Sequence, residues 1–199
     1  MIRYECYEWL ARLLTDQLVI TSLSGQRVEW GHLSKRDADL NLGSMGNALA
    51  VGIGLALALP HRKVLVFESD GSVLLSLFNL PTLANLDPRN LVVFVFDNQA
   101  YSGTRISYPS ATAGKTDLAA VARASGIEHA VTVSQLEDFK NQASDALNES
   151  GPHFVVCKVE ESLGHRKLSR SNVDLLETQY RFVRYLERTE GRAIFQGRG

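Results

Sequence analysis

Apolar and polar positions along the chain predict buried strands that alternate with helices. Continuous apolar runs at Leu18–Thr21, Lys63–Phe67, Leu91–Phe96 and Phe154–Val159 are typical of strands that are covered on both faces. A shorter strand is expected at 129–133. Because strands that alternate with helices usually pair in parallel, the pattern predicts an α/β fold. We expect a single doubly wound parallel sheet of about five or six strands, with helices on both faces.

Amphipathic or small-residue segments between these runs predict the helices. They are expected at 3–15, at 45–59, at 73–86, at 118–125, after a Ser134 cap with Glu137 at the capping-box position, and at 172–189 from Ser171 or Asn172. Residues 24–42 and 99–116 are polar and irregular, and both are expected to be loops that carry functional contacts. The many Gly and Ala residues of 45–59 permit close packing, either on the sheet or on another subunit. Residues 1–190 are expected to form one domain, and 191–199 a flexible tail.

Composition excludes several classes of protein. The 199 residues carry a formal net charge of −1, which gives no broad electrostatic attraction to nucleic acid. No apolar run reaches the roughly 18 residues of a membrane span, and the first residues lack the apolar core of a secretory signal. Cys6 and Cys157 lie in apolar surroundings and are expected to be buried, reduced thiols of a cytoplasmic protein.

Polar residues follow two neighbouring strands of the predicted sheet. Asp70, Gly71 and Ser72 come after one buried strand, and Asn98 follows the next strand, 28 positions after Asp70. The carboxyl ends of parallel strands meet at one edge, where open α/β sheets bind ligands. Carboxylate and amide oxygens suit Mg²⁺, and N–H groups at a helix start suit phosphate. The simpler alternative is that Asp70 only caps the helix that follows.

Two motifs carry a resemblance to a known family. Residues 69–71 read Ser-Asp-Gly and residues 97–98 read Asp-Asn, which resembles the thiamine diphosphate (ThDP) fingerprint of Gly-Asp-Gly and a later Asn-Asn pair. Residues 43–48 read Gly-Ser-Met-Gly-Asn-Ala, which resembles the Gly-Ser-Met-Gly-His-Ala of phosphonopyruvate and sulfopyruvate decarboxylases. The resemblance extends from about Leu42 to Val159 in the expected order. It implies the diphosphate-binding domain of a ThDP-dependent enzyme.

The resemblance implies a metal and diphosphate site. In the family pattern the side chains of Asp70 and Asn98 and the carbonyl of Ala100 would bind Mg²⁺, while Gly71 and Ser72 would hold the diphosphate. The chain departs from the fingerprint at Ser69 and Asp97, where the family has Gly and Asn. Neither of these positions supplies a metal side-chain ligand in the pattern.

The resemblance also implies how the aminopyrimidine end of the cofactor is held. The Gly43 carbonyl would accept from the 4′-amino group, with Ser44 beside it. Met45 would be a wedge that bends the cofactor, a role that suits its large and adaptable side chain. Asn47 stands where the decarboxylase pattern has His, so it is a possible substrate contact. Tyr101 would order over the cofactor with 102–105, although a solvated loop is the alternative.

One expected catalytic group is missing from the motifs. The family's catalytic glutamate belongs to a separate pyrimidine-binding domain, and no glutamate of this chain matches its motif. The resemblance therefore implies the β subunit of a split ThDP- and Mg²⁺-dependent decarboxylase of small 2-oxo acids, active as a hetero-oligomer with an α subunit. The alternatives are an acetolactate-synthase-type carboligase subunit and a non-catalytic ThDP-binding partner protein. The basic cluster His165–Arg170 is either a solvated turn or a contact for an anionic substrate.

Overall fold

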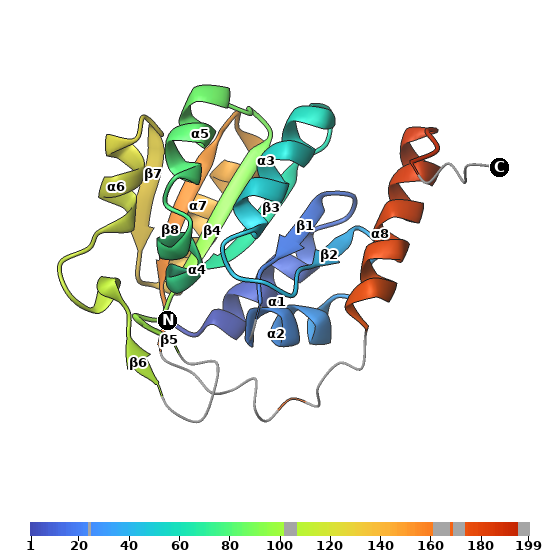
Figure 1. Cartoon of the computed structure of the whole chain (residues 1–199). Helices are drawn as coiled ribbons and strands as arrows, with labels where there is room; N and C mark the ends of the chain where they lie inside the picture. Colours follow the sequence, from blue (N-terminus) through green and yellow to red (C-terminus); the bar gives the residue numbers. More distant parts are fainter. Residues whose placement is uncertain (24, 102–106, 161–167, 169–173, 195–199) are drawn as a thin grey trace.

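Six parallel strands form one central sheet in the order β2-β1-β3-β4-β8-β7 (Figure 1). The strands are β1 (Leu18–Thr21), β2 (Asp39–Asn41), β3 (Val64–Ser69), β4 (Leu91–Asp97), β7 (His129–Val133) and β8 (His153–Lys158). The structure, a computed structural model, describes residues 1–23, 25–101, 107–160, 168 and 174–194. The predicted α/β fold with a parallel sheet is confirmed.

Helices cover both faces of the sheet. They are α1 (Arg3–Leu13), α2 (Gly25–Leu33), α3 (Ala48–Ala58), α4 (Asp70–Leu75), α5 (Asn79–Leu86), α6 (Leu118–Ala124), α7 (Leu136–Asn148) and α8 (Leu175–Glu190). Helices α1, α2 and α7 contribute to an aromatic-rich core on one face. The remaining helices contribute to a mainly aliphatic core on the other face. None of the helices in the described part of the chain is long and apolar enough to cross a membrane.

Strand β4, at the centre of the sheet, shows how the apolar runs build both cores. Side chains on β4 alternate between the two cores: Val93 and Val95 enter the aliphatic core, and Phe94 and Phe96 the aromatic core. All four are fully buried, and each contributes about 1.5–3 kcal/mol from apolar burial. Cys157 on β8 and Cys6 on α1 lie in the aromatic core as free, buried cysteines, so the prediction of buried, unpaired thiols is confirmed.

The predicted loop at 24–42 is wrong. This segment contains α2 and β2, which adds a strand to the edge of the sheet. The glycines at both ends of α2 conceal its helical pattern in the sequence, and long-range contacts stabilise it. Arg3 donates to both carboxylate oxygens of Glu29, at 2.8 and 2.9 Å, and the buried Trp30 ring packs against Tyr7 with centroids 5.7 Å apart. Such contacts override weak local propensity.

Two helix starts also differ from the prediction. The Ser134 capping box is wrong: α7 begins one residue later, with Gln135 as its N-cap and no side-chain cap bond. The Gln135 carbonyl accepts the first helical bond, from the Phe139 N–H at 3.0 Å. The predicted helix start at 45 is wrong as well, because α3 begins at Ala48. Gly46 has φ +77°, a left-handed conformation that interrupts a helix.

The helix expected at 73–86 is two helices, α4 and α5. The break falls at 76–78, where the Ser76 hydroxyl donates to the Ser72 carbonyl at 3.1 Å. Pro81 is accommodated in the first turn of α5, where its missing N–H costs no helical bond. Residues 99–116 contain a hairpin of β5 (Ala100–Tyr101) and β6 (Tyr108–Pro109), then a short 3₁₀ turn. Only part of this loop, outside 102–106, is described.

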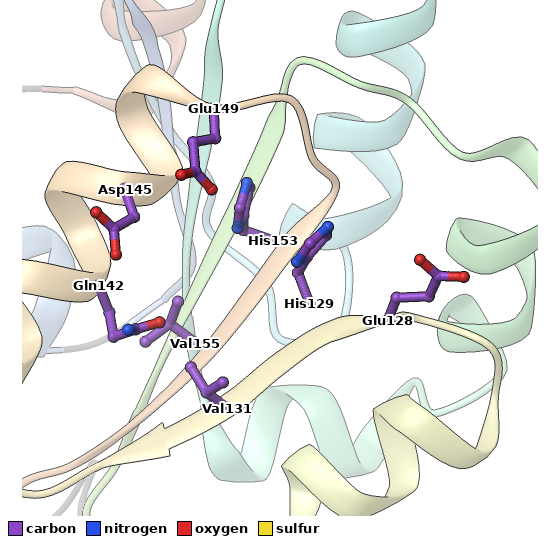
Figure 2. A pocket seen from close by; sticks show the side chains of 8 residues that line it. All are labelled: Glu128, His129, Val131, Gln142, Asp145, Glu149, His153 and Val155. Atoms are coloured by element: carbon purple, nitrogen blue, oxygen red, sulfur yellow. The ribbon is translucent and has the colours of Figure 1, made fainter.

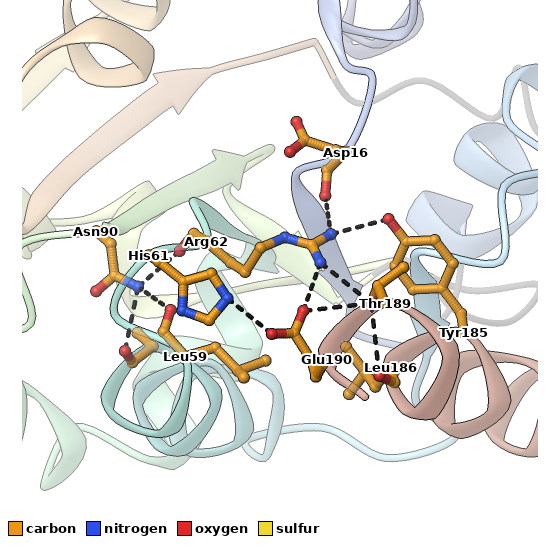
Figure 3. A network of polar contacts seen from close by, with 10 residues as sticks. Asp16, Leu59, His61, Arg62, Asn90, Tyr185, Leu186, Thr189 and Glu190 are labelled. Carbon is orange, nitrogen blue, oxygen red and sulfur yellow. Dashed lines mark hydrogen bonds and ion pairs between the residues drawn. The ribbon is translucent and has the colours of Figure 1, made fainter. Parts of the chain in front are cut away.

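A polar network attaches the C-terminal helix α8 to the loops that precede β1 and β3 (Figure 3). Arg62 donates to Glu190 at 2.7 Å and to the Tyr185 hydroxyl at 2.8 Å, and it also donates to the Asp16 carbonyl. His61 contacts the other Glu190 oxygen at 2.7 Å. The predicted start of this helix at 171–172 is wrong: α8 begins at Leu175, where the extended Asp174 is the N-cap and its carboxylate accepts from the Leu176 N–H at 2.8 Å. It ends at Glu190, and the end of the tail at 195–199 lies outside the described residues.

This network predicts acid sensitivity that depends on Glu190. Burial alone would raise the pKa of Glu190, but hydrogen bonds from His61, Arg62 and Thr189 together lower it. A lowered folded-state pKa contributes stability above the unfolded value of about 4.5, and this contribution disappears as the pH falls below it. Glu190→Gln is therefore expected to cost about 1–3 kcal/mol at pH 7 and much less at pH 3.5. Urea unfolding at the two pH values measures this, and an equal loss at both would contradict it.

Candidate functional site

The carboxyl ends of β3 and β4 lie side by side, because Ser69 pairs with Phe96 in parallel register. Asp70 directly follows β3 as the first residue of α4, and Asn98 directly follows β4. The sheet therefore places the chain segments of the two predicted metal ligands at one edge. The half-buried Ala100 comes two residues after Asn98, beyond a turn in which Gln99 has φ 60°.

Asp70 is fully buried and held by hydroxyl groups. Its Oδ2 accepts a hydrogen bond from Ser110 Oγ and lies 3.1 Å from Thr112 Oγ1. Burial raises the pKa of the Asp70 carboxyl, the Ser110 hydroxyl lowers it, and the nearby Asp97 raises it again. A buried carboxylate beside a second carboxylate is an electrostatically costly arrangement that a bound cation would relieve.

Asp97 extends this cluster. Its Oδ1 accepts from Thr112 Oγ1 at 2.7 Å and from the Gln99 N–H at 2.9 Å. Its Oδ2 accepts from Lys158 Nζ at the end of β8. Asp97, which replaces the Asn of the fingerprint, thus has its charge balanced by the ammonium group of Lys158. The sequence did not indicate Ser110, Thr112 or Lys158; a charged residue in place of a neutral Asn was the one signal that a lysine partner was needed.

Tyr101 packs on Gly71. A Cβ atom at Gly71 would lie 2.4 Å from Tyr101 Cε1, closer than any real contact, so a larger residue at this position would displace the ring. The Tyr101 side chain is 42% exposed, which leaves part of it available beside α4. Residues 102–105, which were expected to act with Tyr101, lie outside the described residues, as does most of the His165–Arg170 cluster.

The Gly43–Gly46 segment contacts the start of α4. Ser72 Oγ accepts a hydrogen bond from the Gly46 N–H at 2.8 Å, and the Ser72 N–H donates to Ser69 Oγ at 3.2 Å. The structure therefore brings both predicted cofactor motifs together through Ser72. Its predicted contact with the diphosphate stays a prediction.

The other residues of this segment are more exposed. Gly43 and Asn47 are exposed, and Ser44 and Met45 are half-buried. Asn47 Nδ2 donates to Ser44 Oγ at 2.9 Å. A half-buried Met45 presents part of its side chain at the surface of this segment, which is compatible with contact to a ligand. Its predicted wedge role stays a prediction.

A further buried carboxyl, Glu68, stands between the two motifs. Burial raises the pKa of Glu68, while the Leu49 N–H, which donates to it, and the nearby Ser72 and Ser22 hydroxyls lower it. The sequence did not indicate a role for Glu68, because no glutamate of the chain matches the motif of the catalytic glutamate. Its position one residue before the Ser-Asp-Gly motif was the available signal.

The donor set at the strand ends suits a hard cation. In the described part of the chain, no group of three or more His, Cys, Asp or Glu side chains could hold a metal ion by itself. A metal between the ends of β3 and β4 would therefore rely on one carboxylate with amide, carbonyl and ligand oxygens. Mg²⁺ accepts this arrangement, because it binds through one or two carboxylates and completes its octahedron with phosphate oxygens and water.

A pocket lies at the opposite end of the parallel strands from the candidate site, at the amino ends of β7 and β8 (Figure 2). It is lined by Glu128, His129, Val131, Gln142, Asp145, Glu149, His153 and Val155. The rings of His129 and His153 stack with centroids 4.9 Å apart. The pocket contains none of the predicted site residues. The candidate site is therefore at the carboxyl ends of β3 and β4.

This histidine pair predicts a second pH effect on stability. Burial lowers the pKa of His153, and the neighbouring His129 lowers it further. Because the folded protein then binds a proton less readily than the unfolded chain, stability is lost as the pH falls through about 6.5. His153→Gln is expected to flatten the stability profile between pH 7.5 and 5.5. Identical profiles for His153→Gln and the unmodified chain in chemical denaturation would contradict this.

A doubly wound sheet whose neighbouring strand ends carry a buried aspartate and an asparagine, beside a Gly-Ser-Met-Gly segment, is the arrangement expected of a diphosphate-binding domain. The comparison with protein families agrees: residues 29–157 match the family model "Thiamine pyrophosphate enzyme, C-terminal TPP binding domain". The chain belongs to this family.

Individual relatives refine this relationship. The chain is 34% identical over 187 residues to sulfopyruvate decarboxylase subunit beta of Methanothermobacter thermautotrophicus, covering 92% of this chain and 94% of the relative. It is 34% identical over 169 residues to phosphonopyruvate decarboxylase of Streptomyces viridochromogenes, covering 82% of this chain but 42% of that protein. Among solved structures, benzoylformate decarboxylase of Polynucleobacter necessarius matches with a TM-score of 0.68 at 18% identity, over 86% of this chain and 34% of that one. The last match shows the shared fold.

Proposed function

We propose that the chain is the β subunit of a split ThDP- and Mg²⁺-dependent 2-oxo acid decarboxylase. The observation that carries this proposal is the match to a sulfopyruvate decarboxylase subunit beta along almost the whole of both chains. The longer phosphonopyruvate decarboxylase, of which the chain covers only 42%, has room for further domains. The candidate substrates are small 2-oxo acids with an anionic tail, such as sulfopyruvate or phosphonopyruvate.

In this proposal the chain's own residues hold the cofactor at both ends. Asp70, Asn98 and the Ala100 carbonyl bind Mg²⁺ and, through it, the diphosphate. Met45 keeps the cofactor bent, and Tyr101 on Gly71 covers it from solvent. When bound, ThDP supplies an electron sink for the carbanion that forms as CO₂ leaves.

An exposed apolar surface supports the need for a partner. Four large apolar side chains are exposed around α3, α4 and α5: Leu57 on α3, Leu75 on α4, Phe78 as the N-cap residue of α5 and Leu86 on α5, with exposed fractions of 47%, 65%, 71% and 47%. Gly54 on α3 has no atom within 4 Å of its Cβ position, whereas Gly52 packs on Val66 of the sheet. Leu75 and Phe78 come soon after the Asp70–Ser72 segment, and exposed apolar side chains beside a ligand site are typical of a protein interface. We assign this surface to the pyrimidine-binding α subunit, which would bring the catalytic glutamate.

The experiment mixes the purified chain with candidate α subunits, ThDP and Mg²⁺, adds sulfopyruvate or phosphonopyruvate, and follows CO₂. Release of CO₂ only in the mixture is expected. Acetolactate formed from pyruvate would instead indicate a carboligase. ThDP binding without turnover with any α subunit would indicate a non-catalytic binding protein.

A further inference from the structure

A buried carboxyl lies between the two cofactor motifs without belonging to either. Glu68 is fully buried near the end of β3. Strand alternation directs it to the same face as Val64 and Val66, the face that α3 covers. A carboxyl group in an apolar core is costly unless it is hydrogen-bonded, so its contacts indicate what it does.

Glu68 caps helix α3 from outside the helix. Its Oε1 accepts a hydrogen bond from the Leu49 N–H, in the first turn of α3, at 3.1 Å. The N-cap residue Asn47 makes no capping bond, because its side chain donates to Ser44 instead. A carboxylate near a helix N-terminus satisfies a free N–H and interacts favourably with the helix dipole. The start of α3 is therefore fixed by a residue of β3.

The same carboxyl also faces the segment that follows Asp70. The Ser72 hydroxyl lies close enough to interact with Glu68, and Ser72 Oγ accepts from the Gly46 N–H at 2.8 Å. Glu68 Oε2 and Ser22 Oγ are both buried, and neither atom has a hydrogen-bond partner among the described residues. Glu68 thus contacts the start of α3, which follows the Gly43–Gly46 segment, on one side and faces α4 on the other.

We propose that Glu68 is a positioning residue that fixes the separation between the Gly43–Gly46 segment and the Asp70–Ser72 segment. It does so through Leu49 and Ser72, and it touches neither ligand nor metal. This inference rests on the proposed function, in which ThDP spans the two segments, because a ligand with two ends binds well only if both subsites are held in register. A ligand that occupies the diphosphate subsite alone does not depend on this separation.

The test compares a two-ended ligand with a one-ended one on the full chain. Calorimetry measures Mg²⁺–ThDP and Mg²⁺–pyrophosphate binding to the unmodified chain, to Glu68→Gln and to the control Glu190→Gln. Glu68→Gln is expected to weaken ThDP binding by about tenfold, because a neutral amide accepts from the Leu49 N–H more weakly than a carboxylate and lacks the charge that interacts with the α3 dipole, while pyrophosphate binding changes less than twofold. The control affects neither ligand. An equal loss for both ligands, or no loss for either, would overturn the proposal.

A second readout needs no cofactor. Amide hydrogen exchange on the unliganded chain is expected to show faster exchange at Leu49 and Gly46 in Glu68→Gln, with unchanged protection along β4. Glu68→Asp, whose shorter side chain draws the carboxylate away from α3, gives the same result and serves if the glutamine variant does not fold. Unchanged exchange at both amides would overturn the positioning role. Failure of the unmodified chain to bind either ligand, with the exchange result intact, would count against the proposed function alone.

Discussion

Asp70→Ala is expected to abolish Mg²⁺-dependent ThDP binding, with a loss of affinity of at least about a hundredfold. The variant removes the one carboxylate among the proposed ligands, and even indirect changes around a metal cost about 10- to 100-fold in affinity. The measurement is calorimetric titration of ThDP with Mg²⁺ and with EDTA. The difference between the two titrations should disappear in the variant.

The fold of Asp70→Ala should survive, because the buried Asp70 carboxyl has a raised pKa and is therefore no source of stability in its charged form. Thermal unfolding checks this. The matched control is Asp37→Ala, which removes a partly exposed carboxylate paired with Arg181 on the surface. Unchanged Mg²⁺-dependent affinity in a folded Asp70→Ala protein would refute the ligand assignment.

Met45→Ala is the substitution with the second largest expected effect. It distinguishes cofactor binding from the activation of the cofactor. In the assembled enzyme it should leave diphosphate binding largely intact, while the exchange of the ThDP C2 proton with solvent slows by about a hundredfold. A small displacement of reacting groups costs rate in this range, and the alanine no longer supports the bent cofactor. Proton NMR of quenched samples follows the exchange.

Met45→Leu provides the control for this variant. It conserves volume and apolar character, so its exchange rate should stay within a few-fold of the unmodified enzyme. If Met45→Ala exchanges the C2 proton as fast as Met45→Leu, then Met45 is a packing residue and the wedge role is wrong.

The central sheet could be predicted because its information is local. Runs such as Leu91–Phe96 are short, rich in Val and Phe, and apolar at every position, which is typical of a strand buried on both faces. The edge of the sheet could not be predicted, since α2 and β2 depend on contacts such as Arg3 with Glu29, 26 positions apart. Neither partner indicates a helix at 24–42 by itself.

Some residues of the candidate site could likewise be predicted from the sequence, and others could not. The strand-end positions of Asp70 and Asn98 could be predicted because each follows a recognisable strand. Ser110, Thr112, Lys158 and Glu68 could not, because their importance comes from neighbours that the fold supplies. Thr112 meets both buried carboxylates from a polar loop, and Glu68 looks in the sequence like any acidic residue at the end of a strand.

The most direct measurement is a crystal structure of the chain, with its partner if needed, soaked with ThDP and Mn²⁺ in place of Mg²⁺. Data collected near the manganese absorption edge locate the ion independently of any fitted coordinates. The account predicts one anomalous peak between the Asp70 and Asn98 side chains, in contact with the cofactor's diphosphate. A cofactor bound elsewhere, or Asp70 and Asn98 side chains directed to opposite sides of the sheet, would contradict it.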